Sequence, residues 1–191
     1  MNARRKHLAN AGKVLNSLGV VYSEQGKQLQ AEECFQRAIK LYKKNISSKH
    51  IDVAGALINL GTIAYDRQNY DEAILKYTKA KKIYDRSLPS IHPNRASLRV
   101  NLGNVYFMSG DYEKAREEYE SALKMQQISL PANHLDIART LHNHAVVHKH
   151  QGNNQQANEY VKRAEEIVNE TLPSNHPFIV SLDTTNSLLI E

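Results

Sequence analysis

The chain has 191 residues, of which 41% are hydrophobic, 24% are charged and one is a cysteine. This length favours one domain, and no apolar run is long enough for a transmembrane helix or a secretory signal peptide. A single cysteine cannot form an intrachain disulfide, which favours a reducing compartment and predicts a cytoplasmic location.

The net charge of +5 is unevenly distributed along the chain. Residues 1–95 contain 17 Lys and Arg against 8 Asp and Glu, whereas residues 96–191 contain 8 against 12. The first half could attract an acidic partner, but solvated surface charge is the simpler interpretation. The basic residues 1–7 are likewise interpreted as a solvated first helical turn rather than as a nucleic-acid-binding arm.

Hydrophobic spacing predicts four pairs of helices, because apolar residues recur at the i, i+3, i+4 and i+7 positions of one helix face. The first helices of the pairs, called A helices here, are predicted at about residues 8–25, 51–67, 93–109 and 135–151. The second, or B, helices are predicted at about residues 29–45, 70–86, 112–128 and 154–170. One more A-type helix is expected at about 177–190, and its apolar end favours a chain cut from a longer array.

The pairs are copies of one sequence repeat with a period of 42 residues. Asn59-Leu60-Gly61 returns as Asn101-Leu102-Gly103. The connectors after the last three pairs share a Leu-Pro-x-x-His pattern in which proline ends the B helix, and residues 46–50 are a degenerate first copy. Repeats are predicted at about 12–50, 54–92, 96–134 and 138–176, within a single array over residues 1–191.

Small residues recur where the two helices of a pair should meet. A mid-helix glycine costs about 1 kcal/mol relative to alanine, so glycines repeated at one period indicate close helix packing. The rings of the B helices are expected to fill the space between successive pairs. The glycines are Gly19, Gly61 and Gly103, and the rings are Phe35, Tyr77 and Tyr119. The fourth repeat replaces Leu-Gly by His144-Ala145, which leaves the packing of this pair open.

Leu-Gly and a ring in the A helix, followed by Ala and an aromatic residue in the B helix, resemble the tetratricopeptide repeat (TPR). Leu18-Gly19 with Tyr22, Ala31 and Phe35 matches that consensus, and the third repeat matches it equally. The 42-residue period, the Asn-Leu-Gly core and the Leu-Pro-x-x-His-Pro connector resemble the kinesin light chain class of these repeats. The resemblance covers about residues 12–180. It implies an all-α, right-handed α-solenoid of four antiparallel helix-turn-helix units with a C-terminal extra helix.

In this family a peptide segment of a partner lies in a concave groove lined by the A helices, which implies the same groove here. The A-helix residues not needed for packing are left to face the ligand. These predicted groove residues are Asn16, Val20, Ile58, Asn59, Thr62, Tyr65, Ser97, Val100, Asn101, Asn104, Phe107, Arg139, His142 and Asn143. Most of the affinity is expected from Tyr65, Phe107, Val100 and Ile58, so the ligand should carry hydrophobic anchors, and an acidic ligand is compatible.

The asparagines of this set leave two interpretations open. Asn59, Asn101 and Asn143 could pair with the backbone of a peptide, or they could hydrogen-bond the neighbouring repeat and fix the stacking. Some TPR proteins bind the acidic C-termini of chaperones through a carboxylate clamp of cationic and Asn side chains. At the matching positions only Arg139 carries charge, so no clamp is predicted.

The histidines are not predicted to bind a metal. His50, His92, His134 and His176 recur at the repeat period, but packed helices lie about 8–10 Å apart, too far for one zinc ion, so local pairing with the backbone is predicted. His144 and His148 have i, i+4 spacing, but Ala145 stands where a zinc protease needs its glutamate. A core-facing pair is predicted instead.

No nucleophile motif, acid–base pair or phosphate-binding loop is found, so the sequence predicts neither an enzyme nor a cofactor. The predicted function is a protein–protein interaction module or adaptor. A self-assembling structural scaffold and a regulatory segment of a larger multidomain protein remain alternatives. No nucleic-acid or membrane partner is predicted, and self-association stays compatible with the charge asymmetry.

Overall fold

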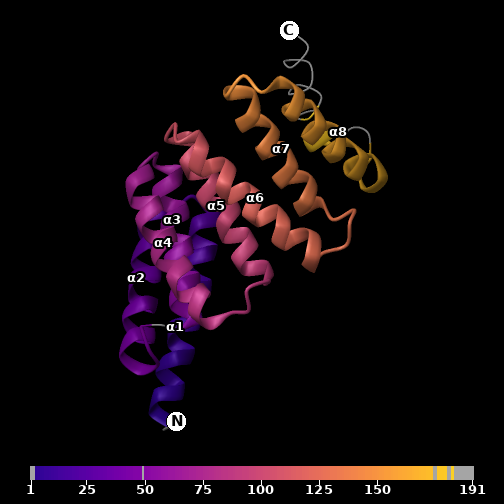
Figure 1. Cartoon of the computed structure of the whole chain (residues 1–191). Coiled ribbons are helices and arrows are strands. Elements are labelled where there is room, and N and C mark those ends of the chain that lie inside the picture. Colours follow the sequence, from indigo (N-terminus) through magenta and orange to yellow (C-terminus); the bar gives the residue numbers. More distant parts are fainter. Residues whose placement is uncertain (1–2, 49, 174–175, 180–181, 183–191) are drawn as a thin grey trace. The chain divides into compact units, whose positions relative to one another are not determined.

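The computed structural model describes residues 3–48, 50–173, 176–179 and 182 (Figure 1). All regular secondary structure within these residues is helical. The A helices are α1 (Ala3–Glu24), α3 (Ile51–Asp66), α5 (Pro93–Met108) and α7 (Leu135–His150). The B helices are α2 (Gln28–Asn45), α4 (Tyr70–Ser87), α6 (Tyr112–Ser129) and α8 (Asn154–Thr171).

The predicted all-α solenoid of helix pairs is confirmed. Each predicted A and B helix begins and ends within one residue of its observed bounds, except that α1 begins at residue 3 rather than at 8. Residues 177–179 and 182 are also helical, and the rest of the predicted extra helix lies outside the described residues.

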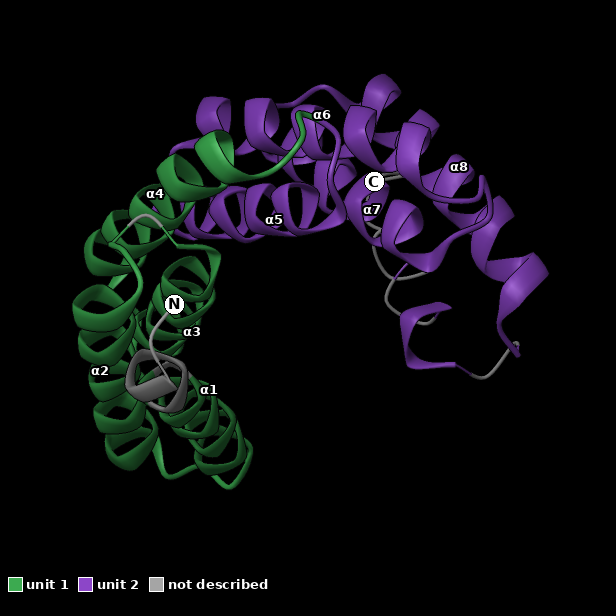
Figure 2. Ribbon diagram, turned by 90° about the horizontal axis from the view of Figure 1, so that it is seen from below, with its two compact units in different colours: residues 1–90 green, residues 91–191 purple. Residues whose placement is uncertain are grey.

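The chain divides into two compact units, residues 1–90 and 91–191 (Figure 2). In the first unit α1 packs along α2 and α3 along α4, and α3 also contacts both helices of the first pair. The second unit repeats this arrangement with α5 to α8. Each unit therefore has a layer of A helices and a layer of B helices. The prediction that one array covers the whole chain, and the repeat bounds given above, stay predictions.

A histidine caps the N-terminus of each later A helix. The Nδ1 atoms of His50, His92 and His134 accept hydrogen bonds from the backbone N–H two residues later, at 3.1–3.3 Å. His176 accepts the same bond from the N–H of Phe178 at 3.2 Å. An N-cap acceptor pairs with one of the helix donors that have no partner in the first turn. The predicted pairing of these histidines with nearby backbone is confirmed.

Within each pair, an A-helix glycine lies directly against an aromatic ring of the B helix. A β-carbon added at Gly61 would lie 2.5 Å from the Tyr77 ring, and one at Gly103 would lie 2.5 Å from the Tyr119 ring. Because carbon atoms in contact need about 3.5–4 Å, only glycine leaves room for the ring. The same contact joins Gly19 to Phe35. A fourth contact of this kind, between Gly12 and Tyr42, was not predicted from the sequence.

This contact corrects the expectation that the rings fill the space between successive pairs. Each ring packs first against the glycine of its own pair, and Tyr119 in addition joins a buried cluster with Val147 of the next pair. The rings therefore set the spacing of the two helices within a pair, and they contribute to stacking as well.

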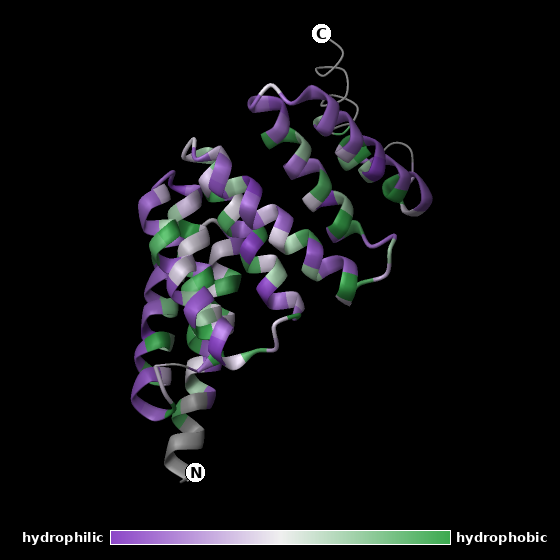
Figure 3. Ribbon diagram, in the orientation of Figure 1, coloured by the Kyte–Doolittle hydropathy of each residue, from purple (hydrophilic) through white to green (hydrophobic). Residues whose placement is uncertain are grey.

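Hydrophobic and hydrophilic residues alternate along each helix (Figure 3), as expected for helices that bury one face. In α3, which contacts both helices of the preceding pair, Leu60 and Ile63 are buried. At the matching positions of α1, Leu18 and Val21 are 39% and 45% exposed, because among the described residues no helix pair precedes α1. Burial of this apolar face thus depends on stacking rather than on the helix itself.

The fourth pair buries two histidines, one where the other repeats have Leu and one where the first and third repeats have Tyr. His144 and His148 are 2% and 5% exposed, and their ring centroids lie 4.4 and 5.4 Å from that of Tyr160. Neither nitrogen of His144 has a hydrogen-bond partner among the described residues. Burial lowers the pKa of His144 to about 4, with smaller effects from His148, Glu120 and Arg116, so the ring is neutral at pH 7. The predicted core-facing pair is confirmed.

We expect Gly61→Ala to destabilise the chain by about 1–3 kcal/mol, because the new methyl group would collide with the buried Tyr77 ring. The matched control is Gly55→Ala in the same helix, where no atom lies within 4 Å of the added carbon. That substitution should instead stabilise by up to about 1 kcal/mol through helix propensity. Urea unfolding of both variants tests this prediction, and equal effects of the two would contradict the packing role of Gly61.

We expect His144→Leu, which restores the residue of the other repeats, to stabilise the chain by about 1–3 kcal/mol at neutral pH, because it removes an unpaired buried polar group. The advantage should grow as the pH falls from 6.5 towards about 4, because the unfolded histidine gains a proton there and the buried one does not. The slope should be about 1.4 kcal/mol per pH unit. Chemical unfolding of both proteins across this range measures it, and parallel profiles would rule it out.

Candidate peptide-binding surface

The predicted groove residues all lie on A helices, in two sets that belong to the two units. The α1–α3 face consists of Asn16, Val20, Ile58, Asn59, Thr62 and Tyr65. The α5–α7 face consists of Ser97, Val100, Asn101, Asn104, Phe107, Arg139, His142 and Asn143. The A helices of each unit contact one another, so each face is formed by two neighbouring helices.

On the α1–α3 face, hydrogen bonds within the fold occupy the polar side chains. Asn59 Nδ2 donates to Asn16 Oδ1 at 3.3 Å and links α3 to α1. Thr62 Oγ1 lies 3.0 Å from the Tyr77 hydroxyl and donates to the carbonyl of Ile58 at 3.2 Å. These side chains therefore connect neighbouring helices before any ligand is present.

The apolar members of the α1–α3 face remain available. Val20 is 37% exposed, and Ile58 and Tyr65 are half-buried. The Tyr65 ring lies 6.0 Å from that of Tyr70 in a tilted arrangement, which holds it at the C-terminal end of α3. Burial, followed by the proximity of Tyr70 and Asp66, raises the pKa of Tyr65, so its hydroxyl is neutral near pH 7 and can donate or accept a hydrogen bond.

On the α5–α7 face, one asparagine is the centre of a small polar network. Asn104 Oδ1 accepts hydrogen bonds from the Tyr119 hydroxyl at 2.6 Å and from Asn143 Nδ2 at 3.0 Å. Asn104 occupies the same repeat position as Thr62, so both bind the tyrosine that packs on the glycine of their own pair. The network joins α5, α6 and α7.

Two of the predicted anchors of the α5–α7 face are engaged in packing. Val100 and Phe107 lie against the buried cluster that contains Tyr119 and Val147. The Phe107 ring also lies 5.0 Å from that of His150, edge-on. Their role in ligand binding is therefore limited to the parts of their side chains that remain exposed.

The remaining members of the α5–α7 face differ in how much they contact other residues of the fold. The ring of His142 lies 5.8 Å from that of Phe178, and burial lowers its pKa. Ser97 and Arg139 are exposed and Asn101 is half-buried, and none of these three side chains forms a hydrogen bond or ion pair with another described residue. They are the groups on this face that can turn towards a ligand.

Two of the three asparagines considered above, Asn59 and Asn143, hydrogen-bond the preceding A helix. They therefore contribute to stacking, which was one of the two interpretations left open. A signal for the Thr62 and Asn104 bonds was present in the sequence, since each lies 15 residues before its tyrosine. Among the described residues, no group of three or more His, Cys, Asp or Glu is arranged to hold a metal ion.

Sequence reasoning also missed a feature of the B-helix layer. The positive charge of the first half was interpreted as solvated surface charge. The structure instead gathers six Lys and Arg side chains of α2 and α4 around one groove. The i, i+3 spacing of Lys76, Lys79 and Lys82 was the signal, since residues at that spacing share a helix face.

The tetratricopeptide repeat family profile matches residues 8–86, 52–128 and 94–170, which together cover most of the chain. No curated protein sequence matches the chain significantly.

Several solved structures share the fold. A protein of Podosopora anserina assigned as a kinesin light chain with nearly identical TPR-like repeats is 21% identical, with a TM-score of 0.80 over 96% of this chain and 86% of that one. BtubC (BKLC) from P. vanneervenii is 25% identical, with a TM-score of 0.78 over 86% of this chain and 67% of that one. The apo form of RapI is 17% identical, with a TM-score of 0.85 over 95% of this chain and 64% of that one.

Four findings indicate the same family. They are the glycine–ring contact within each helix pair, the stacking of each A helix on the preceding pair within a unit, the family match over successive repeats and the fold of these solved structures. The chain belongs to the tetratricopeptide repeat family, and it shares the fold of the TPR-like repeat protein assigned as a kinesin light chain.

Proposed function

We propose that this chain is a non-enzymatic adaptor that binds a peptide segment of a partner protein on the A-helix layer. TPR proteins are generally protein–protein interaction modules, which supports the class of function. The observation that supports the surface is the state of the α1–α3 face, where polar bonds fix two neighbouring helices and leave Val20, Ile58 and Tyr65 accessible.

The ligand proposed for this face is a short segment with hydrophobic anchors. Aromatic and aliphatic anchors dominate peptide affinity, and a rigid surface loses little entropy when it binds. Tyr65 and Ile58 are the anchors we favour on this face, and Val100 and Phe107 are their equally half-buried counterparts on the α5–α7 face. Arg139 is the one charged side chain among the fourteen predicted groove residues, so we propose no carboxylate clamp for chaperone C-termini.

None of the helices in the described part of the chain is long and apolar enough to cross a membrane. We propose a cytoplasmic location, supported by the single cysteine, Cys34, which is buried and unpaired.

The test is a peptide selected from a random display library against the whole chain, followed by NMR mapping and affinity measurements. Tyr65→Ala should weaken binding of the selected peptide by about tenfold, the loss expected for an anchor worth 1–2 kcal/mol. The control is Leu75→Ala, which trims an apolar side chain that is 51% exposed on α4 and should change affinity less than about twofold. Chemical shift changes confined to B helices, or an equal loss in both variants, would refute the assignment to the A-helix layer.

A further inference from the structure

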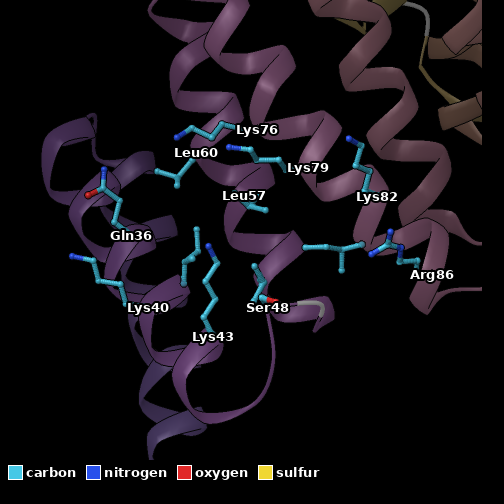
Figure 4. Close-up of a pocket in the computed structure, with 13 residues that line it drawn as sticks. Gln36, Lys40, Lys43, Ser48, Leu57, Leu60, Lys76, Lys79, Lys82 and Arg86 are labelled. Atoms are coloured by element: carbon cyan, nitrogen blue, oxygen red, sulfur yellow. The ribbon is translucent and has the colours of Figure 1, made fainter.

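The B-helix layer of the first unit contains a groove with an apolar floor and a basic rim (Figure 4). The groove has a volume of about 640 Å³ and lies between α2 and α4, over α3. Leu57 and Leu60 lie in its middle, between the lysines of α2 and the cations of α4. The floor residues are Ile39, Val53, Leu57, Leu60 and Ile83, and the cations are Lys40, Lys43, Lys76, Lys79, Lys82 and Arg86.

Among the described residues, most of these cations have no ion-pair partner. Lys76 pairs with Glu72 at 3.1 Å. The other five cations form no ion pair with any residue of the described ranges, and the groove lining contains no Asp or Glu. Like charges gathered around a concave surface raise the local potential and attract anions.

The fold does not require these charges, as the matching groove of the second unit shows. That groove has a volume of about 300 Å³ and lies two 42-residue repeats later, between α6 and α8. Its floor is equally apolar, with Ile137, Leu141 and Ile167 at the positions of Val53, Leu57 and Ile83. Its rim is less basic, because Gln127 stands at the position of Lys43 and Glu166 at that of Lys82, whereas Arg163 keeps the cation of Lys79. The repeat therefore fixes the floor, and the basic rim is particular to the first groove.

We propose that this groove is a second docking site, distinct from the A-helix layer, for an acidic peptide segment that also carries apolar side chains. Lys76 and Arg86 are ten residues apart on α4, which corresponds to about 15 Å along the helix. An extended peptide covers that length with about five residues at 3.3 Å each. Acidic side chains of such a segment meet the rim, and alternate apolar side chains meet Leu57 at the floor.

The lining favours a peptide over a nucleic acid. Single strands are held by aromatic side chains on which bases stack, and none of the described residues that line the groove is aromatic. The apolar floor gives a phosphate backbone nothing to contact, whereas it suits leucine or another aliphatic side chain of a peptide.

The probe is a fluorescein-labelled peptide of about eight residues, Asp and Glu with leucine at every second position, measured by fluorescence anisotropy against the whole chain. Two matched peptides replace the acids by Asn and Gln, or the leucines by alanine. Both should bind at least about tenfold more weakly, since one loses the charge and the other the apolar contact. Binding should also weaken as salt is raised, because the rim is exposed.

The decisive variants carry the same change in net charge. Lys43→Glu with Lys82→Glu reverses two cations of the rim, whereas Lys13→Glu with Lys44→Glu reverses two exposed lysines outside it. The first pair should lower affinity by at least about tenfold and the second by less than about twofold. Circular dichroism checks that both variants are folded, and NMR mapping on the unaltered chain should show shifts in α2 and α4.

Three results would overturn the proposal. Equal losses in both double variants would show unspecific attraction to a positive chain. Equal binding of the uncharged peptide would remove the role of the rim. A thymidine oligonucleotide that binds more tightly than the peptide and is released by Lys43→Glu with Lys82→Glu would make the groove a nucleic-acid surface. Tyr65→Ala should leave binding of the acidic peptide unchanged, so this test is independent of the A-helix site.

Discussion

The contact between a glycine of the A helix and an aromatic ring of the B helix is the constraint on which this structure depends. It occurs at Gly19, Gly61 and Gly103 with the same geometry, and a single methyl group at any of them would overlap the ring. Since a mid-helix glycine is unfavourable for an isolated helix, the pair must recover that cost through close packing. The hydroxyls of Tyr77 and Tyr119 then reach Thr62 and Asn104 and fix the ring within the A-helix layer.

In the A-helix layer, residues that stack the helices lie beside those proposed to bind a ligand. Asn59 and Asn143 bind the preceding A helix, and Val100 and Phe107 contribute to packing. A face whose polar side chains are already held can offer its remaining apolar groups without first becoming ordered, which lowers the entropic cost of binding. This is the physical basis for preferring Tyr65 and Ile58 as anchors.

In the B-helix layer, different residues form the apolar floor of a groove and its rim in contact with solvent. Its floor residues must be apolar because they close the core between successive pairs, and Leu57 and Leu141 show this in both units. Its rim residues contact solvent and can vary in charge without effect on the core. A repeat protein can therefore acquire a charged binding surface by rim substitutions alone, while the floor remains common to all repeats.

The sequence by itself determined the helices, their pairing and the family, because periodic apolar positions, repeated Leu-Gly steps and prolines after the last three B helices are local signals that need no tertiary information. It also determined the caps, since His92 and His134 act on a backbone N–H two residues away. Only the tertiary structure decided which groove residues are engaged within the fold and which remain for a ligand. Asn59 and Phe107 look alike in the sequence as unused A-helix residues, but their partners lie on other helices. The basic groove is likewise invisible to a count of charges, because it forms only where α2 and α4 bring their lysines to opposite sides of Leu57.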